Sequence, residues 1–297
     1  MKKYDYDIIV IGAGSWGLTV SIWLAGAGKR VALVEKGLIW GDCTNTGCVP
    51  SKAFIDIAKK NYLRKENKNL KEILKEVRER RQIIVDEETP EKIEEYWMKV
   101  IQGFGKIVWK NSVSINWKQK ITSKDIVLAT GSHWKTYEIE WIYKKEILTN
   151  ENVFELEENI KDLVVMWGWY IWCELAEAFA NSWVNVTIIQ RNARLIPREE
   201  KESSHLMRKI FDEKGIKVFT DTIVEKVEWN TLIVIDKVTK EKKEIKFYKI
   251  LQALWRWANT KNLWLENVWI EFSEKWIKVD KYNRTNIKNI FAIWDCV

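Results

Sequence analysis

The sequence of 297 residues predicts an α/β fold in which parallel sheets are built from two strand–helix–strand units. Two apolar runs, at 4–14 and 163–166, each lead into a tight turn and a helical pattern. Each helical pattern is followed by a further apolar run, at 31–37 and 184–191, which completes the unit. The hydrophobic content of 46% and charged content of 31% are typical of a globular chain with a substantial core.

Composition and charge exclude several classes of protein. No apolar run is long enough to span a membrane, and the short N-terminal run leads into a glycine turn instead of a signal-peptide cleavage site. The net charge of +7 is spread over interspersed acids and bases, as at 60–81, which is typical of a solvated helix. We therefore expect a cytoplasmic protein that binds neither nucleic acid nor membrane.

The segments between the two units alternate helix and strand patterns. Residues 43–65 predict a turn that opens a helix, and a polar helical region continues to about residue 96. Residues 98–132 predict short strands and hairpins, and 213–254 predict mostly strand. A last short strand is expected in "NIFAI" at 289–293.

Tryptophan is unusually abundant, with 19 Trp beside 13 Gly. Several tryptophans fall where turn physics favours glycine: Trp117 and Trp229 in expected hairpin turns, Trp183 at a helix end and Trp276 before a strand. An aromatic core or a base-stacking surface would instead place Trp at strand or helix periodicity. We therefore predict that most or all of the 19 positions are glycine in the cell. The simplest cause is a gene in which UGA encodes glycine, translated with a code in which UGA means tryptophan.

The first unit carries the spacing Gly12-x-Gly14-x-x-Gly17 between its strand and its helix. Glycines at this spacing let the backbone approach a pyrophosphate, and the N-terminus of the helix stabilises the negative charge. Glu35 ends the next strand at the distance expected of an acid that binds a ribose hydroxyl. The pattern predicts a dinucleotide site.

The segment "WGDCTNTGCVPSK" at 40–52 places Cys43 and Cys48 at the start of a helix. A helix N-terminus lowers the pKa of a nearby thiol, and closely spaced cysteines in a cytosolic chain favour redox chemistry or a metal. A zinc site would need a second pair of ligands, and the only histidines are His133 and His205. We expect a redox pair and no metal site.

Five segments together resemble the FAD-dependent pyridine nucleotide-disulfide oxidoreductases, in the branch of dihydrolipoamide dehydrogenase, glutathione reductase and mercuric reductase. They are residues 40–52, "ATGS" at 129–132, "VVMWGWYIWCELA" at 164–176, "ALWRWANT" at 253–260 and "NIFAIWDCV" at 289–297. The match requires glycine at Trp40, Trp167, Trp169 and Trp172, and Ala258 stands where the family has proline. The resemblance covers essentially the whole chain, in the family's order.

The resemblance implies a role for each motif residue. Cys43 would attack the disulfide substrate, Cys48 would face the flavin, and Lys52 would lie by the flavin N5 region. Asp295 would bind the ribityl chain, and Glu174 would lie near the nicotinamide. The remaining candidates for cofactor binding are Gly12, Gly14, Trp16, Gly17, Glu35, Lys36, Gly41, Asp42, Gly105, Ala129, Thr130, Gly131, Ser132, Trp167, Gly168, Trp169, Tyr170, Ile171, Trp172, Gln190, Arg191, Val224, Trp255 and Trp294.

The implied cofactors are FAD and either NAD or NADP. Gln190 stands where an NAD-specific acid would lie, and Arg191 and Arg194 follow it. Arginines at this place can hold a 2′-phosphate, which slightly favours NADP, although they are equally consistent with ordinary surface residues.

The resemblance also implies a domain order. We expect an FAD domain at 1–148 that returns at 273–297, with an NAD(P) domain inserted at 149–272; both are Rossmann-like and doubly wound. The family's C-terminal dimerisation domain, with its His-Glu acid/base pair, is expected to be absent because the chain stops at Val297. The full-length form would be a homodimer.

Two classes of function fit this sequence. The first is a disulfide reductase most like dihydrolipoamide dehydrogenase, whose substrate is a small or protein-bound disulfide, with a mercuric reductase acting on Hg(II) as the alternative. The second is a non-catalytic, Trp-rich protein derived from the same fold.

Overall fold

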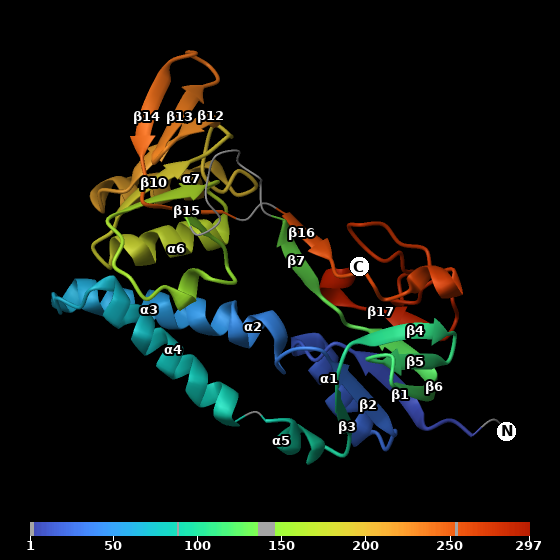
Figure 1. The fold of residues 1–297 in the computed structure, drawn as a ribbon. Coiled ribbons are helices and arrows are strands. Elements are labelled where there is room, and N and C mark those ends of the chain that lie inside the picture. Colours follow the sequence, from blue (N-terminus) through green and yellow to red (C-terminus); the bar gives the residue numbers. More distant parts are fainter. Residues whose placement is uncertain (1–2, 88, 136–145, 253–254) are drawn as a thin grey trace. The chain divides into compact units, whose positions relative to one another are not determined.

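The computed structural model describes residues 3–87, 89–135, 146–252 and 255–297, and every element below lies within them (Figure 1). The chain divides into two compact units. The first comprises Met1–Asn45, Ile83–Lys135 and Trp255–Val297, and the second comprises Thr46–Gln82 and Thr136–Leu254. The expected FAD and NAD(P) domains have other boundaries, which stay a prediction.

The first unit is organised around one mixed sheet in the order β3-β2-β1-β6-β5-β4, with β17 paired to β6. Ile9 and Ile11 point into one core cluster, while Ile8 and Val10 point into another. Because successive side chains of a strand face opposite ways, a continuous apolar run fits a strand that is buried on both faces. The strands are β1 (Tyr6–Ile11), β2 (Val31–Glu35), β3 (Lys99–Gln102), β4 (Gly105–Trp109), β5 (Ser112–Ile115), β6 (Gln119–Leu128) and β17 (Ile290–Ala292).

Pairing within this sheet changes from parallel to antiparallel at β6. β1 pairs in parallel with β2 and β6, whereas β4, β5 and β6 form an antiparallel meander. A separate two-stranded antiparallel sheet joins β7 (Ser132–Lys135) and β16 (Trp255–Ala258). The helical elements of this unit are α1 (Ser15–Gly26), α2 (Gly41–Asn45), α5 (Pro90–Glu94), η3 (Leu265–Val268) and η4 (Trp294–Cys296).

The second unit contains a five-stranded parallel sheet in the order β11-β10-β9-β15-β8. These strands are β8 (Ile147–Leu148), β9 (Asp162–Met166), β10 (Asn185–Ile189), β11 (Lys217–Phe219) and β15 (Lys249–Leu251). An antiparallel sheet is formed by β12 (Thr222–Glu228), β13 (Thr231–Asp236) and β14 (Lys242–Lys246).

Helices complete the second unit. The aromatic ring of Phe54 meets that of Phe179 edge-on at 5.0 Å, which packs α3 against α6. The helices are α3 (Cys48–Arg64), α4 (Leu70–Glu87), which runs on into the first unit, α6 (Tyr170–Ala180), α7 (Lys201–Glu213) and the 3₁₀ turn η2 (Val153–Glu155).

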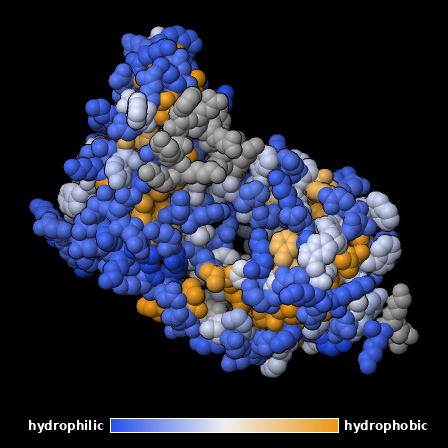
Figure 2. Space-filling view, in the orientation of Figure 1, coloured by the Kyte–Doolittle hydropathy of each residue, from blue (hydrophilic) through white to orange (hydrophobic). Residues whose placement is uncertain are grey.

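The two predicted strand–helix–strand units are confirmed as β1–α1–β2 and β9–α6–β10. Residues 43–65 contain the predicted turn, at Thr46 and Gly47, and the helix that it opens, α3; the turn is preceded by the short helix α2. Polar side chains cover most of the visible surface (Figure 2). In the part of the chain that the structure describes, no helix combines the length and apolarity needed to cross a bilayer.

Among the described residues, nine tryptophans adopt a left-handed backbone conformation with positive φ. Left-handed backbone costs an L-residue other than glycine roughly 1–2 kcal/mol, so nine such indoles are unusual. The expected turn positions Trp117, Trp183 and Trp229 are among them, but Trp276 is not. Ten of the tryptophans whose side chains are described are exposed, Trp229 at 93%, which is inconsistent with an aromatic core. The nine are Trp40, Trp97, Trp117, Trp167, Trp183, Trp229, Trp264, Trp269 and Trp294.

Candidate nucleotide and thiol sites

The turn between β1 and α1 has no room for side chains at two of its glycines. A Cβ on Gly12 would come within 2.2 Å of the carbonyl oxygen of Ala129, and a Cβ on Gly17 would come within 1.9 Å of that of Gly12. Gly12 also has φ +107°, and Gly14 caps α1 without a side chain. The first N–H groups of α1 therefore face a cradle lined by backbone, which fits a pyrophosphate.

Glu35 is buried at the end of β2, where both of its carboxylate oxygens accept backbone hydrogen bonds. The N–H of Ala13 donates to Oε2 at 2.6 Å, and that of Gly37 donates to Oε1 at 2.7 Å. The carboxylate thus braces the turn, and each oxygen keeps a second lone pair for a ribose hydroxyl. Lys36 lies with its Nζ 5.9 Å from the ring centre of Phe104.

The other predicted flavin segments of this unit converge on the same turn. The N–H of Ala129 donates to the carbonyl of Ile11 at 2.8 Å, and Ser132 Oγ lies 3.1 Å from Asp295 Oδ2. Thr130 and Gly131 lie between these two contacts. The structure therefore brings together three motifs that are far apart in the sequence.

Three more predicted positions lie in the first unit. Gly41 has φ +57° and is the first residue of α2. A Cβ added to it would lie 3.0 Å from the Cα of Gly14. Gly105 is buried at the start of β4 against Val34 and Ile11, a packing position. Trp255 begins β16 by its backbone, and its side chain lies outside the described part of the chain.

In the sequence as given, two tryptophan side chains lie at this turn. The rings of Trp16, in the first turn of α1, and Trp294, in η4, stack with their centres 4.6 Å apart. Both are partly exposed, at 43% and 59%. Such a stack competes for the space in front of the helix N-terminus, so the residues fit a dinucleotide when these two positions are glycine.

The turn between β9 and α6 holds the second predicted nucleotide motif. Trp167 has φ +71°, its N–H donates to the carbonyl of Ile189 at 2.8 Å, and Trp169 caps α6. Trp172 is only 2% exposed, while Tyr170 and Ile171 are exposed on the same helix. The side chains of Trp167 and Val224 pack against one core cluster, so Val224 lies near this turn.

Gln190 follows β10 and is 1% exposed. Its Oε1 accepts from the N–H of Gly168 at 3.4 Å, and its Nε2 donates to the carbonyl of Arg194 at 2.9 Å. Arg191 is exposed beside it, whereas Nη1 of Arg194 is buried and makes no hydrogen bond to any residue that the structure describes. A buried guanidinium nitrogen of this kind calls for an anionic acceptor.

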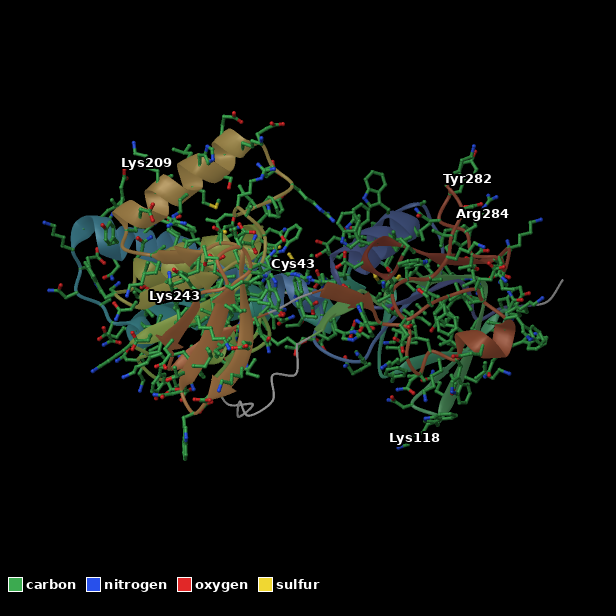
Figure 3. The ribbon with its side chains drawn as sticks, turned by 90° about the horizontal axis from the view of Figure 1, so that it is seen from above. Cys43, Lys118, Lys209, Lys243, Tyr282 and Arg284 are labelled. Atoms are coloured by element: carbon green, nitrogen blue, oxygen red, sulfur yellow. The ribbon has the colours of Figure 1, made fainter. Side chains whose placement is uncertain are left out.

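The two motif cysteines lie on consecutive helices, and neither is part of a disulfide. Cys43 is partly buried in α2 (Figure 3), and Cys48 is exposed as the first residue of α3, where the helix dipole favours an anion. Cys173 and Cys296 are buried; desolvation raises the pKa of Cys173 to about 12 and also raises that of Cys296. The motif pair is therefore the more accessible of the two pairs.

Lys52 and Glu174 form an ion pair at 2.6 Å between α3 and α6. Sequence reasoning assigned these residues to different cofactors, and it did not foresee their contact. It also missed Arg256, whose guanidinium contacts Asp42, Ser132 and Asp295. The signal was present, because Arg256 lies within the quoted segment "ALWRWANT".

The family model described as "Pyridine nucleotide-disulphide oxidoreductase" matches residues 6–297. The chain belongs to this family. A mercuric reductase of Staphylococcus aureus is 31% identical over 98% of the chain and 56% of its own length. A dihydrolipoyl dehydrogenase of Bacillus subtilis is 32% identical over 99% of the chain and 66% of its own length.

Among solved structures, the HOCl-induced flavoprotein disulfide reductase RclA from Escherichia coli matches this family member with a TM-score of 0.85 and 25% identity. The match covers 98% of the chain and 66% of RclA. The chain thus spans between about half and two thirds of the length of these relatives.

Proposed function

We propose that this chain contains the FAD- and NAD(P)-binding parts and the redox thiols of a flavoprotein disulfide reductase. The observation that carries the proposal is the convergence of the β1–α1 turn, residues 129–132 and Asp295 in the same unit as Cys43. The chain covers only part of each relative, so the activity is proposed for the full-length protein, which we expect to be a cytoplasmic homodimer.

The proposal requires glycine at positions 16, 167, 169, 172 and 294. The stacked rings of Trp16 and Trp294 compete for the space in front of α1, and Trp169 caps α6 at the turn meant for the nicotinamide nucleotide. The nine left-handed tryptophans support the same replacement, because glycine alone adopts this conformation without a Cβ penalty. We therefore propose that the cell inserts glycine at these positions.

The protein's own groups then divide the chemistry between them. FAD, when bound, supplies a two-electron relay between reduced nicotinamide and the thiols. Two electrons and two protons convert a Cys43–Cys48 disulfide into two thiols. Cys43 as a thiolate attacks one sulfur of the substrate disulfide and releases the other as a thiol. Cys48 then displaces the second thiol and restores the Cys43–Cys48 disulfide. The Lys52–Glu174 pair orients a cation where Lys52 is proposed to meet the flavin.

NADPH is the proposed reductant. Gln190 is neutral and its amide is committed to Gly168 and Arg194, so it cannot act as the acid that receives a ribose 2′-hydroxyl in NAD. The exposed Arg191 and the unpaired Nη1 of Arg194 supply two cations for a 2′-phosphate.

The proposed substrate is a lipoamide-type disulfide, free or protein-bound. The named relatives include both dihydrolipoyl dehydrogenases and mercuric reductases, so Hg(II) is the alternative. Either substrate would be handled by the exposed Cys48 and partly buried Cys43 pair.

The first experiment reads the residue that the source organism inserts. We expect UGA codons at all 19 tryptophans, and peptide masses from the native protein that correspond to glycine. The chain made with glycine should then purify with a flavin absorption spectrum that NADPH bleaches, while the tryptophan chain should purify colourless. UGG codons would overturn the replacement and favour a non-catalytic Trp-rich protein; a glycine chain without flavin would overturn the reductase.

A further inference from the structure

Arg256 lies at the centre of a side-chain cluster in the first unit. It stands on β16, opposite Trp134 of β7, and its Nε donates to Ser132 Oγ at 2.6 Å. Its Nη2 lies 2.9 Å from Asp42 Oδ2 and 3.2 Å from Asp295 Oδ2. One guanidinium therefore joins the strand after β6, the helix of Cys43 and the turn of Asp295.

The contact with Asp42 is the arm that reaches the thiol. Asp42 directly precedes Cys43 on α2, which is only five residues long. A helix of this length has no stability of its own, so its orientation depends on its side-chain contacts. Asn45, at the other end of α2, donates to the carbonyls of Ile39 and Gly41, which lie at or just before the start of the same helix.

The other arms form a closed triangle that does not include α2. Arg256, Ser132 and Asp295 contact one another at 2.6, 3.1 and 3.2 Å. Because Ser132 and Asp295 hold the guanidinium in place, the N–H of Nη2 that donates to Asp42 has a fixed direction. Asp42 is 53% and Arg256 33% exposed, so their ion pair adds little to stability. Its effect is to orient α2.

We propose that Arg256 is a positioning residue that fixes Cys43, through Asp42, against the turn of Asp295. The consequence for thiol–disulfide exchange rests on the proposed function, whereas the positioning itself does not. The residue sets how far the partly buried thiol of Cys43 is presented for attack.

The test measures the rates at which iodoacetamide alkylates Cys43 and Cys48. The protein is reduced and carries, at the tryptophan positions, whichever residues the source organism inserts. Peptide fragmentation locates the label, and Cys173 and Cys296 serve as buried references. Direct electrostatics predicts opposite effects: Arg256→Met removes a cation and slows Cys43, while Asp42→Ala removes an anion and accelerates it. Positioning predicts the same sign, because both changes release α2 and expose the thiol.

We expect both variants to label Cys43 about threefold faster or more, the scale of coupling between contacting residues. The labelling rate of Cys48 should not change in either variant. The double variant should label Cys43 at the same rate as each single variant. Arg256→Lys should label Cys43 at a rate between those of Arg256→Met and the wild type. Arg30→Met is the matched control, since Arg30 bridges Asp7 and two carbonyls elsewhere in the same unit and should leave Cys43 unchanged.

Opposite signs, or additive effects in the double variant, would overturn the positioning role. If Arg256→Met does not fold, the Cys43 labelling rates of Asp42→Ala and Arg256→Lys decide whether Arg256 positions Cys43. Labelling needs neither flavin nor nucleotide, so a chain that fails to bind flavin but shows the coupling refutes only the reductase. A flavin-binding chain without coupling refutes only the positioning.

Discussion

The two strand–helix–strand units are built alike, but they carry different residues at the same turn positions. Positions in β9–α6–β10 correspond to those in β1–α1–β2 at a constant offset: α1 is capped by Gly14 and α6 by Trp169. Where the first unit has Gly12, Gly14, Gly17 and Gly28, the second has Trp167, Trp169, Trp172 and Trp183.

The backbones at these positions are nearly identical. The N–H of Gly12 donates to Val34 and that of Trp167 to Ile189, both at 2.8 Å. Gly28 and Trp183 end their helices at φ +76° and +66°. The same backbone conformation, which favours glycine, thus occurs in both units, but only the first unit has glycine at these positions. The difference is best explained by the codon and not by the fold.

The largest expected effect concerns the third glycine of the first unit. Gly17→Ala would place a methyl group 1.9 Å from the carbonyl oxygen of Gly12, so the turn must open. We expect the free energy of unfolding to fall by about 3 kcal/mol and bound flavin to be lost. Urea unfolding and the absorption spectrum measure both.

Gly26→Ala is the matched control, in the same helix. Nothing lies within 4 Å of its added methyl group, so the chain should gain roughly 0.5–1 kcal/mol. If Gly17→Ala is as stable as this control, the third slot does not exclude side chains, and the corresponding Trp172 would need no replacement.

A second difference between the units lies at the end of the second strand, where Glu35 is the last residue of β2 and Gln190 directly follows β10. Gln190→Glu restores an acid that repels a 2′-phosphate, and Arg191→Ala removes a cation that attracts it. We expect each change to reduce the preference for NADPH over NADH by about tenfold, or 1.4 kcal/mol. Stopped-flow reduction of the flavin at several nucleotide concentrations gives the ratio.

Lys201→Ala, at the start of α7, is the matched control for loss of a nearby surface cation. It should leave the nucleotide ratio unchanged. Equal ratios in Arg191→Ala and the parent chain would assign Arg191 to the ordinary surface.

The sequence predicted both strand–helix–strand units because a buried parallel strand is a continuous apolar run, as in β1 and β9. It also located Cys43 and Cys48, since their spacing is local. The contacts of Arg256 with Asp42 and of Lys52 with Glu174 were beyond it, because each joins side chains more than 100 positions apart. Neither pair carries a local pattern that names its partner.

The smallest expected effect tests the left-handed helix ends. In a chain with glycine elsewhere, tryptophan at position 183 must hold φ +66° while its ring stays 56% exposed and its centre lies 5.7 Å from that of Tyr62. We expect this chain to be about 1 kcal/mol less stable than the one with glycine at 183. Gly28→Ala, at the corresponding site with open space around it, should cost a similar amount through φ alone. If tryptophan at 183 proves the more stable residue while Gly28→Ala is destabilising, the ring contact with Tyr62 outweighs the backbone strain, and the two helix ends are not equivalent.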